Sequence, residues 1–401
     1  MQSRRNFIGN VATGLAGTLA TGNALGANDR IRVGLIGAGA RGTELVQQAL
    51  ACGNVECVAA ADVYTRRLED IKRAAPAAKT YLDYRQLLED RDVDAVLIAT
   101  PHHLHGEQFV AALSARKHVY QEKTMAFTVE QAKRMRAAHQ DNGGRCTVQI
   151  GHQWLSAGAA KDAQFFNQPE LMGKITTIQA QMWRNTPAGK PQWSRPVYPD
   201  MTPENIHWRS FLGEARPVEF DPNRYINWRY FWDYSGGNVF ENMCHQLSFW
   251  YKVLDLKIPR AVTMTGGIYL WKDGREVPDT MNVSMEHEEE LLYTWQSGFG
   301  NDQLKVGEDV LGENGTISRT PNTIRYVPQK VNRREGNEMT GATRSDPKAH
   351  MQNFFDSIRG ARQPNCPFEI GYRTSISCRM AVESYRLQRT VRWDPVAEEI
   401  V

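Results

Sequence analysis

The sequence has few cysteines, little net charge and no repeats. Its six cysteines form no C-x-x-C pair and no dense framework, so we expect mostly buried thiols, and no disulfide pairing is indicated. The net charge of +3, which includes Arg4 and Arg5, argues against nucleic acid as the main partner. The composition is that of an ordinary globular protein, and 401 residues are enough for two domains with full cores.

The first 26 residues differ in composition from the rest. Ser3-Arg4-Arg5-Asn6-Phe7-Ile8 precedes a mildly apolar run from Gly9 to Ala20, and Ala24-Leu25-Gly26 offers small residues for cleavage. This pattern predicts a twin-arginine signal peptide over residues 1–26, with a disordered basic leader as the alternative. A protein exported by this route folds first, so it would carry its cofactor into the periplasm or another exported location. No stable membrane span is expected after cleavage.

One stretch organises the rest of the sequence. An apolar run over 31–36 leads into Gly37-x-Gly39-x-x-Gly42, and residues 43–50 continue with helical periodicity. This order of strand, turn and helix lets a pyrophosphate approach free backbone amides, because no Cβ blocks it. Gly37 would make the tight turn, Gly39 the close approach and Gly42 the contact between helix and strand. The glycines alone are also compatible with a plain tight turn.

A second strand strengthens the prediction of a dinucleotide site. Residues 55–61 are apolar and lead into Asp62, 20 residues after Gly42. An acidic side chain at this position accepts hydrogen bonds from the adenosine ribose and repels a 2′-phosphate, which favours NAD over NADP. Arg66 and Arg67 leave that preference open. The alternative is a degenerate fold that has lost its cofactor.

A histidine-rich loop follows the next predicted strand. Residues 93–100 are short and apolar, as in a buried parallel strand, and Pro101-His102-His103-Leu104-His105 comes directly after them. Ligands gather at the carboxyl ends of such strands, so we expect these histidines near the nicotinamide ribose or the substrate, with plain loop packing as the alternative. Their spacing is too tight for all three to reach one metal ion, and we expect no metal.

The alternation of strands and helices ends with a predicted strand at 147–153. Residues 174–183 and 259–330 then favour strands separated by long polar intervals, which suits an open, mainly antiparallel sheet. The expected fold class is therefore α/β. It comprises a Rossmann dinucleotide-binding domain over 30–150 and an α/β substrate domain over 151–401.

Between those two strand regions, residues 183–235 are rich in Trp, Arg, Pro and Tyr. Aromatic faces beside hydrogen-bond donors suit a sugar ring, whose C–H face stacks while its hydroxyl groups form hydrogen bonds. An ordinary long packing loop is the alternative. From this segment we predict substrate contacts at Trp183, Arg184, Trp228 and Arg229.

Two further segments carry residues suited to oxidising a secondary alcohol. The reaction needs a hydride acceptor above the carbon and a base within hydrogen-bond reach of the hydroxyl group. His245 suits the role of base, and Glu241, four residues earlier on the same helical face, would orient its ring. Lys123 would polarise the hydroxyl oxygen. The alternatives are a hydrogen-bonded core histidine and a lysine paired with Glu122.

Four motifs stand in order along the chain. They are Gly37-x-Gly39-x-x-Gly42, Ala99-Thr100-Pro101-x-x-x-His105, His118-Val119-x-x-Glu122-Lys123 and Gly236-Gly237-x-x-x-Glu241-x-x-x-His245. Together the motifs resemble the glucose-fructose oxidoreductase, inositol dehydrogenase and MocA family of sugar oxidoreductases. The likeness runs from about Arg30 to the end of the chain.

The resemblance implies a C-terminal domain whose open sheet covers the nicotinamide and often builds subunit contacts, and hence a homo-oligomer, either a dimer or a tetramer. It also implies that Lys123 lies beside the hydroxyl group being oxidised and that Glu241 and His245 complete the site. Two positions depart from the family pattern. Thr124 stands where the family usually has Pro, and Glu241 stands where it usually has Asp.

The predicted site has three parts. Catalytic residues are predicted at Lys123, His245 and Glu241; cofactor contacts at Gly37, Gly39, Ala40, Arg41, Gly42, Asp62, Thr100, Pro101, His102, His105, Glu122 and Lys123; and substrate contacts at His152, Gln153, Trp183, Arg184, Trp228, Arg229 and Gln246.

Three functions are compatible with this site. The first is an exported NAD(P)-dependent dehydrogenase that oxidises a secondary hydroxyl of a sugar or glycoside. It would keep NAD tightly bound and be reset by a second carbonyl substrate, because free NAD is scarce outside the cytoplasm. The second is an NAD-dependent glycoside hydrolase that works by transient C3 oxidation, elimination and hydration. It ranks lower because the known glycosidase branch has Tyr-Pro-Thr-His where this chain has Asn242-Met243-Cys244-His245. The third is a non-catalytic sugar-binding protein.

Overall fold

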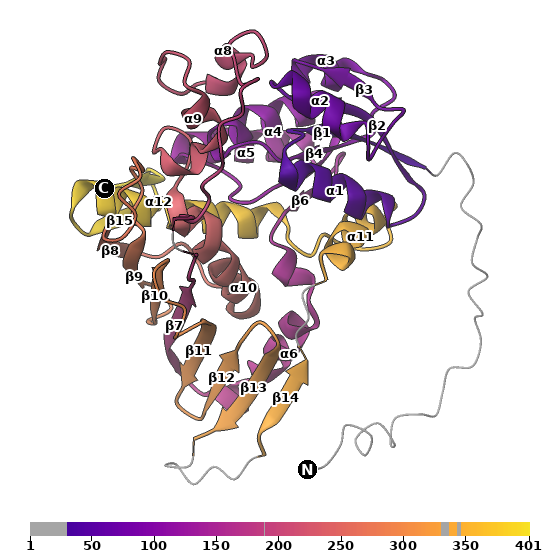
Figure 1. Ribbon diagram of the computed structural model, residues 1–401. Coiled ribbons are helices and arrows are strands. Elements are labelled where there is room, and N and C mark those ends of the chain that lie inside the picture. The colour runs from indigo at the N-terminus through magenta and orange to yellow at the C-terminus, as the bar shows by residue number, and fades with distance from the viewer. Residues whose placement is uncertain (1–29, 188, 330–336, 343–345) are drawn as a thin grey trace, which may run out of the picture. The chain divides into compact units, whose positions relative to one another are not determined.

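The computed structural model describes residues 30–187, 189–329, 337–342 and 346–401, so the predicted export leader lies outside the described residues. By their contacts, residues 31–401 group into one unit, which is built around two sheets (Figure 1). Across those described ranges, no helix combines the length and the apolar character needed to cross a membrane.

The first sheet has six parallel strands in the order β3-β2-β1-β4-β5-β6. This is the strand order of a dinucleotide-binding Rossmann fold, in which ligands bind where the order reverses between β1 and β4. The central strands are apolar on both faces because helices cover both sides. The strands are β1 Ile31–Ile36, β2 Val55–Ala61, β3 Lys79–Tyr81, β4 Ala95–Ile98, β5 His118–Gln121 and β6 Val148–Ile150.

Alternate residues of these strands pack into two different apolar clusters. Val33 and Leu35 join one cluster with α1 and the distant helix α11, whereas Ile36 joins the other with α3, α4 and α5. Thus α11, which lies in the sequence between strands of the second sheet, completes the core of the first. The helices are α1 Ala40–Leu50, α2 Thr65–Ile71, α3 Tyr84–Glu89, η4 His102–Leu104, α4 His105–Ser114, α5 Val129–Asn142 and α11 Pro347–Ile358.

The second sheet has ten strands in the order β14-β13-β12-β11-β7-β10-β9-β8-β15-β16. All neighbouring pairs are antiparallel except β7 with β10, which run parallel. The predicted α/β class with an open, mainly antiparallel second sheet is therefore confirmed. The strands are β7 Ile175–Trp183, β8 Ala261–Gly267, β9 Thr280–Glu286, β10 Leu292–Gly298, β11 Val306–Gly312, β12 Gly315–Arg319, β13 Thr323–Pro328, β14 Met339–Ala342, β15 Val391–Asp394 and β16 Glu399–Ile400.

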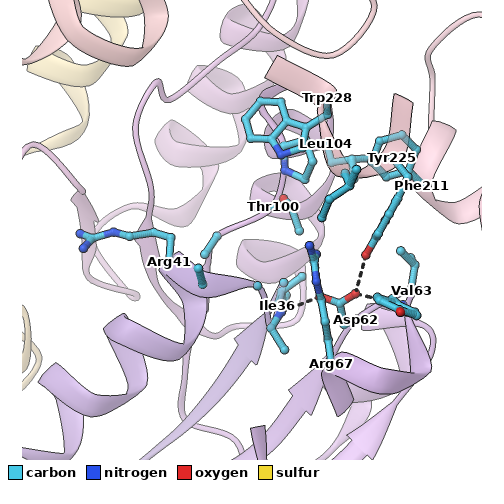
Figure 2. A pocket seen from close by; sticks show the side chains of 18 of the residues that line it. Ile36, Arg41, Asp62, Val63, Arg67, Thr100, Leu104, Phe211, Tyr225 and Trp228 are labelled. Atoms are coloured by element: carbon cyan, nitrogen blue, oxygen red, sulfur yellow. Dashed lines mark hydrogen bonds and ion pairs between the residues drawn. The ribbon is translucent and has the colours of Figure 1, made fainter. Parts of the chain in front are cut away.

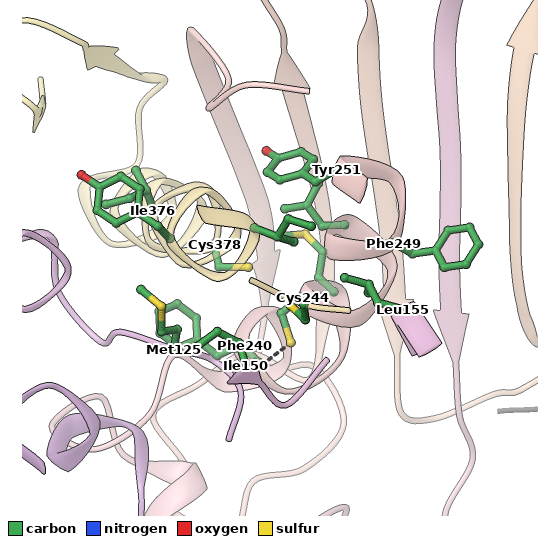
Figure 3. Close-up of a cluster of buried hydrophobic side chains, with 14 of the residues drawn as sticks. Met125, Ile150, Leu155, Phe240, Cys244, Phe249, Tyr251, Ile376 and Cys378 are labelled. Atoms are coloured by element: carbon green, nitrogen blue, oxygen red, sulfur yellow. Dashed lines mark hydrogen bonds between the residues drawn. The ribbon is translucent and has the colours of Figure 1, made fainter. Parts of the chain in front are cut away.

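Helix α12 links the two sheets, because it packs against β8 of the second and against α5 and β6 beside the first. Between α10 and α12 lies a buried apolar cluster that includes Cys244, Phe240 and Cys378 (Figure 3). The remaining helical segments are η5 Gln153–Ser156, α6 Gly158–Phe166, α7 Pro169–Met172, α8 Trp208–Leu212, α9 Pro222–Ile226, η6 Trp228–Tyr230, the π-helix η7 Val239–Met243, α10 Cys244–Leu254 and α12 Phe368–Leu387.

The six cysteines are all free thiols, and only Cys52 is partly exposed, which confirms the prediction of mostly buried thiols. Burial raises the pKa of Cys244 to about 11, so this thiol stays protonated at neutral pH.

Candidate functional site

The glycine turn between β1 and α1 is shaped to receive a pyrophosphate. Gly37 has a φ of +94°, and a Cβ there would lie 2.9 Å from the backbone of Ala99. A Cβ on Gly42 would lie 2.0 Å from the Gly37 oxygen, so the helix can approach the strand only with glycine at this position. Gly39 caps α1 without a side-chain bond to its first amides, which leaves them to an anion. These residues fit a dinucleotide.

Asp62 follows β2, at the position expected for the adenosine ribose. Its carboxylate accepts hydrogen bonds from the backbone nitrogens of Ala38 at 2.7 Å and Tyr64 at 2.9 Å. The Tyr225 hydroxyl lies 3.5 Å away and Arg67 3.7 Å away. Asp62 is only 7% exposed, so its orientation is fixed from several sides. An oriented carboxylate at this strand end suits the ribose hydroxyls of a dinucleotide.

A cavity of about 760 Å³ extends from the glycine turn past Asp62 on one side and to Glu241 on the other. Figure 2 shows Tyr225 and Phe211 beside Asp62 and Arg67, with Trp228 above Thr100. This volume lies in the range of small-molecule and cofactor sites. The predicted residues that line it are Gly37, Gly39, Ala40, Arg41, Asp62, Thr100, Pro101, Trp228, Arg229 and Glu241.

At the far end of this cavity, Glu241 gathers positively charged groups. Its carboxylate bonds to the Lys123 Nζ at 2.8 Å and to the Arg229 Nε at 2.9 Å, and the His102 Nε2 lies 3.3 Å away. Burial alone would raise the pKa of Glu241, but Arg229 and Lys123 together hold it well below the usual range. The carboxylate is therefore ionised, and it fixes the position of the Lys123 ammonium beside Arg229.

Thr124, which stands where the family usually has Pro, ties the Lys123 loop to the segment that carries Glu241. Its hydroxyl donates to the Phe240 oxygen at 2.7 Å, a bond that proline has no group to make. The peptide between Lys123 and Thr124 is cis. Lys123 and Glu241 thus belong to two segments that are joined directly beside the site.

Glu122 also holds the site together. Its carboxylate accepts hydrogen bonds from Arg41 on α1, with both Nε and Nη2 2.8 Å from the same oxygen. The other Arg41 nitrogen bonds to Glu44 at 2.8 Å. The predicted cofactor residue Glu122 therefore links the glycine turn to the strand end that carries Lys123.

His245 lies against two other aromatic rings. The ring centroids of His152 and Trp154 are 5.8 Å and 5.2 Å from that of His245. Burial lowers the pKa of His245 well below its usual value, and the charge of Lys123, which is near enough to interact with the ring, lowers it further. Burial likewise lowers the pKa of His152 to about 3. Both rings are therefore neutral at physiological pH.

Within the part of the chain that the structure describes, these two histidines keep unused polar atoms. His245 has a buried Nδ1 with no hydrogen-bond partner, and His152, which is 0% exposed, has none at either nitrogen. Buried polar atoms normally find partners, so these unpaired atoms are candidate contacts for ligand groups. The neighbouring Gln153 also keeps a buried, unpaired Oε1.

The structure corrects three sequence-based assignments. Glu241 does not orient the ring of His245, because its carboxylate is bonded instead to Lys123 and Arg229. His105 has its two ring nitrogens 2.9 Å and 2.8 Å from the backbone oxygens of Thr100 and Thr124, so it braces two loops and has no free atom for the cofactor.

Gln246 is the third correction. Its Oε1 accepts from the Trp295 Nε1 at 2.7 Å, and its Nε2 donates to the Gln181 and Gly307 oxygens at 3.2 Å and 3.3 Å. With both amide atoms bonded inside the protein, Gln246 fixes α10 on the second sheet and offers nothing to a substrate.

Two predicted substrate residues lie beside the charged network. The Arg184 Nη2 donates to the Asn242 Oδ1 at 3.0 Å, next to Glu241. Trp183 packs its ring at the place where a Cβ on Gly298 would stand, and its Nε1 is buried without a partner. Both lie at the end of β7 and flank the site, but neither lines the large cavity.

One wall of the cavity contains no residue that was singled out from the sequence. It is formed by Trp193, Arg195, Tyr198, Met201, Ser210, Phe211, Tyr225 and Ile226. These residues belong to the aromatic segment that was predicted to bind sugar. The composition of this segment predicts a binding surface. Only the position of the segment against β2 and α2 shows that it faces the Asp62 end of the cavity. Among the described residues, no cluster of three or more His, Cys, Asp or Glu side chains could hold a metal ion.

Comparison with known proteins supports the first sheet most directly. Residues 31–150 match the sequence model of the GFO, IDH and MocA oxidoreductase family, described as an NAD-binding Rossmann fold. This match confirms the predicted fold and cofactor of that range. Inositol 2-dehydrogenase from Salmonella typhimurium (strain LT2) is 37% identical over 123 residues, or 30% of this chain and 36% of that protein.

A glycosyl hydrolase family 109 protein from Shewanella baltica is 35% identical over 112 residues, which are 26% of this chain and 24% of that protein. Both aligned segments thus cover roughly a third or less of the relatives' own length.

Solved structures resemble nearly the whole chain. Levoglucosan dehydrogenase in complex with NADH and levoglucosan gives a TM-score of 0.69 at 17% identity, covering 90% of this chain and 99% of that one. The WlbA dehydrogenase from Bordetella pertussis, in complex with NADH and UDP-GlcNAcA, gives 0.67 at 18% identity, covering 91% and 99%. At these identities the likeness establishes the two-sheet fold alone.

Proposed function

Since residues 31–150 belong to the NAD-binding Rossmann fold of the GFO, IDH and MocA oxidoreductase family, we propose that the protein oxidises a secondary hydroxyl group of a sugar or glycoside. The observation that carries the proposal is the Lys123–Glu241–Arg229 network, which lies at one end of a cavity whose other end is the Asp62 ribose site. A nicotinamide cofactor bound there supplies the hydride acceptor for the reaction.

Different residues bind the cofactor, stabilise charge on the substrate and accept its proton. Gly37, Gly39 and the free amides of α1 hold the pyrophosphate, and Asp62 holds the adenosine ribose. Lys123, held in place by its bond to Glu241, donates a hydrogen bond to the hydroxyl oxygen and stabilises negative charge on it. Neutral His245 is the group able to accept the hydroxyl proton, since its Nδ1 has no partner.

A sugar-like substrate fits the polar groups around the site. Several hydroxyl groups could bond to His152, Gln153 and Arg229, while Trp228 offers an aromatic edge above the cavity. The inositol and levoglucosan dehydrogenases among the similar proteins act on polyhydroxylated rings, in line with this class of substrate.

The glycoside hydrolase remains the second candidate, supported by the similarity to a glycosyl hydrolase family 109 protein. Such an enzyme would oxidise C3 transiently, lose the glycosidic bond by elimination, add water and return the hydride. It consumes no second redox substrate.

One experiment separates the two candidates. Purified protein is incubated with aryl glycosides without added NAD, and released phenol, keto-sugar and reduced cofactor are measured. A lasting keto-sugar with reduced cofactor supports the dehydrogenase, and phenol without keto-sugar supports the hydrolase. If no sugar or glycoside in a broad panel changes, and His245→Asn and Lys123→Met still bind the same ligands, the protein is a non-catalytic sugar binder.

The cellular location is part of the same proposal. The Arg4-Arg5 leader pattern predicts export of the folded protein, with its cofactor, to the periplasm. A fusion of residues 1–26 to a reporter should be exported, and replacing both arginines with lysine should stop export. Export of the doubly substituted leader would contradict the twin-arginine assignment. The homo-oligomer implied by the family resemblance stays a prediction, which light scattering of the purified protein would test.

A further inference from the structure

The segment after β7 returns to the first sheet and pairs with it just beyond Asp62. Ile206 forms an antiparallel bridge with Tyr64. The Thr65 nitrogen donates to the Asn205 oxygen at 3.0 Å, and the His207 nitrogen donates to the Val63 oxygen at 2.8 Å. The chain therefore lies across the start of α2, over the adenosine end of the cavity.

Side chains of this segment form an apolar cluster that includes one residue of the first sheet's loops, Tyr64. The ring centroids of Tyr64 and Tyr225 are 5.8 Å apart, and those of Phe211 and Tyr225 are 5.2 Å apart. This cluster holds the segment closed against the Rossmann domain. Its buried members are Tyr64, Met201, Ile206, Phe211, Leu212, Tyr225, Ile226, Tyr230, Phe231 and Tyr234.

Asp200 makes the polar part of the attachment. One of its oxygens accepts from the Tyr64 hydroxyl at 2.5 Å, and the other accepts from Arg66 at 3.0 Å. Arg66 also lies over the ring of Tyr198, 4.8 Å from its centroid. The carboxylate of Asp200 thus joins the segment to Tyr64, directly before α2, and to Arg66 in the first turn of α2.

The same segment reaches Asp62 and Arg67. The Tyr225 hydroxyl lies 3.5 Å from the Asp62 carboxylate, and the Arg67 guanidinium carbon lies 5.1 Å from the centroid of the Tyr225 ring. Figure 2 shows Tyr225 beside Asp62 and Arg67. With Arg67 beside Asp62 and Arg66 beside Asp200, both arginines have a carboxylate partner. A 2′-phosphate would have to compete with these carboxylates, so the arrangement favours NAD.

We propose that residues 198–226 form an adenosine cover, which completes the cofactor site and retains the nucleotide as a resident group. The proposal rests on the proposed function only in taking the nucleotide to be NAD. Tyr198, Met201, Phe211 and Tyr225 of the cover line the cavity opposite Asp62. For NAD to leave, the cover must open, and opening breaks the Asp200 bonds and exposes the apolar cluster. Release is therefore slow.

The test compares two variants that loosen the attachment with one that does not. Tyr64→Phe removes the hydroxyl and keeps the ring, and Asp200→Ala removes both polar bonds. Asp92→Ala is the matched control, because Asp92 also bonds to two side chains, Arg32 and Lys79, but does not line the cavity. The measurements are the nucleotide content of the purified protein, identified by mass after denaturation, and the rate of NAD release into nucleotide-free buffer.

We expect wild type and Asp92→Ala to retain about one NAD per chain. Asp200→Ala should release NAD roughly tenfold to a hundredfold faster, since it loses hydrogen bonds to a charged group, and Tyr64→Phe several-fold faster. Equal release rates in all four proteins, or a wild type that loses NAD within seconds, would overturn the cover. Thermal unfolding checks that each variant is folded, and Tyr64→Phe keeps the packing if Asp200→Ala proves unstable.

The result is independent of the chemistry. With saturating added NAD, both loosened variants should turn over sugar at the wild-type kcat if the proposed function holds. If none of the proteins oxidises any sugar while the release rates still differ as expected, the proposed function fails and the cover stands. If sugar turnover is normal while the NAD release rates of the variants equal that of wild type, the proposed function stands and the cover fails.

Discussion

The two ends of the cavity are built differently. At the Asp62 end, the carboxylates and arginines are bonded to one another, and aromatic rings close the wall. At the Glu241 end, one carboxylate holds two cations, and the neighbouring histidines keep buried nitrogens without partners. At the Asp62 end the polar groups bond to one another and stabilise the structure, whereas at the Glu241 end some polar groups have no partner within the protein and could bond to a ligand. We infer that the first retains a ligand and the second transforms one.

The largest difference between the two ends is expected when Lys123 is replaced. Lys123→Met removes the charge that stabilises the alkoxide, so we expect kcat for sugar oxidation to fall by roughly 10²–10⁴-fold, the range typical of a lost catalytic group. The nucleotide content should not change, because the adenosine end is untouched. The exposed Lys72→Met serves as the control. A kcat within threefold of wild type would remove Lys123 from the mechanism.

Glu241 tests whether the charged end also supports stability. Glu241→Gln leaves Lys123 and Arg229 without their shared anion in a mostly buried place, so the free energy of unfolding should drop by about 3 kcal/mol. Urea unfolding measures this change. Glu241→Asp keeps the charge and should lose less than half as much. If the two variants are equally stable, the carboxylate charge is not what holds these groups together.

Acid should destabilise the protein through its buried histidines, three of which lie at the Glu241 end. His102, His152 and His245 have pKa values lowered by burial, so unfolding raises their affinity for protons. Their stabilising contribution is complete above the unfolded value of about 6.5 and is lost as the pH falls below it, by up to about 1.4 kcal/mol per pH unit for each.

Glu241 and Tyr64 do not titrate in that range, whereas His103, His287 and His350, whose pKa values burial lowers to about 4, add to the loss elsewhere in the protein. The pKa of Glu241 is lowered, so its contribution is lost only below about pH 4.5, and burial raises the pKa of Tyr64 to about 12. The melting temperature should therefore fall between pH 7 and pH 5. The decrease should be smaller in His152→Gln, measured by calorimetry at both pH values, and a drop of equal size in that variant would argue against its part in the effect.

The smallest effect is expected at Thr124. Thr124→Val removes the hydroxyl and leaves the Phe240 oxygen without its bond, which should cost about 1 kcal/mol of unfolding free energy. Thr124→Ser keeps the hydroxyl and should lie closer to wild type. Denaturant unfolding of both variants provides the measurement. A serine variant as unstable as the valine variant would show that the methyl group matters more than the bond.

Much of the Rossmann half could be predicted from local patterns. The glycine turn, the acidic residue after β2 and the short apolar strands each follow from backbone conformation, close approach or burial within a few residues. The partners of long side chains could not be predicted in this way. Spacing on one helix suggested that Glu241 serves His245, yet two cations from other segments, Lys123 and Arg229, take its oxygens.

The ligand that the aromatic segment faces could not be predicted from the sequence for the same reason. Its residues suit a sugar face or an adenosine wall equally well, and composition does not distinguish them. Only the bridge from Ile206 to Tyr64 decides which end of the cavity it covers.

By itself the sequence determined the alternating strands and helices of the first domain, the pyrophosphate turn and the identity of the catalytic candidates, because these depend on which residue types a local backbone tolerates. The tertiary structure decided which charges share Glu241, which histidines keep free nitrogens and what closes over the adenosine. Those outcomes depend on segments far apart in the chain that compete for the same few buried polar atoms.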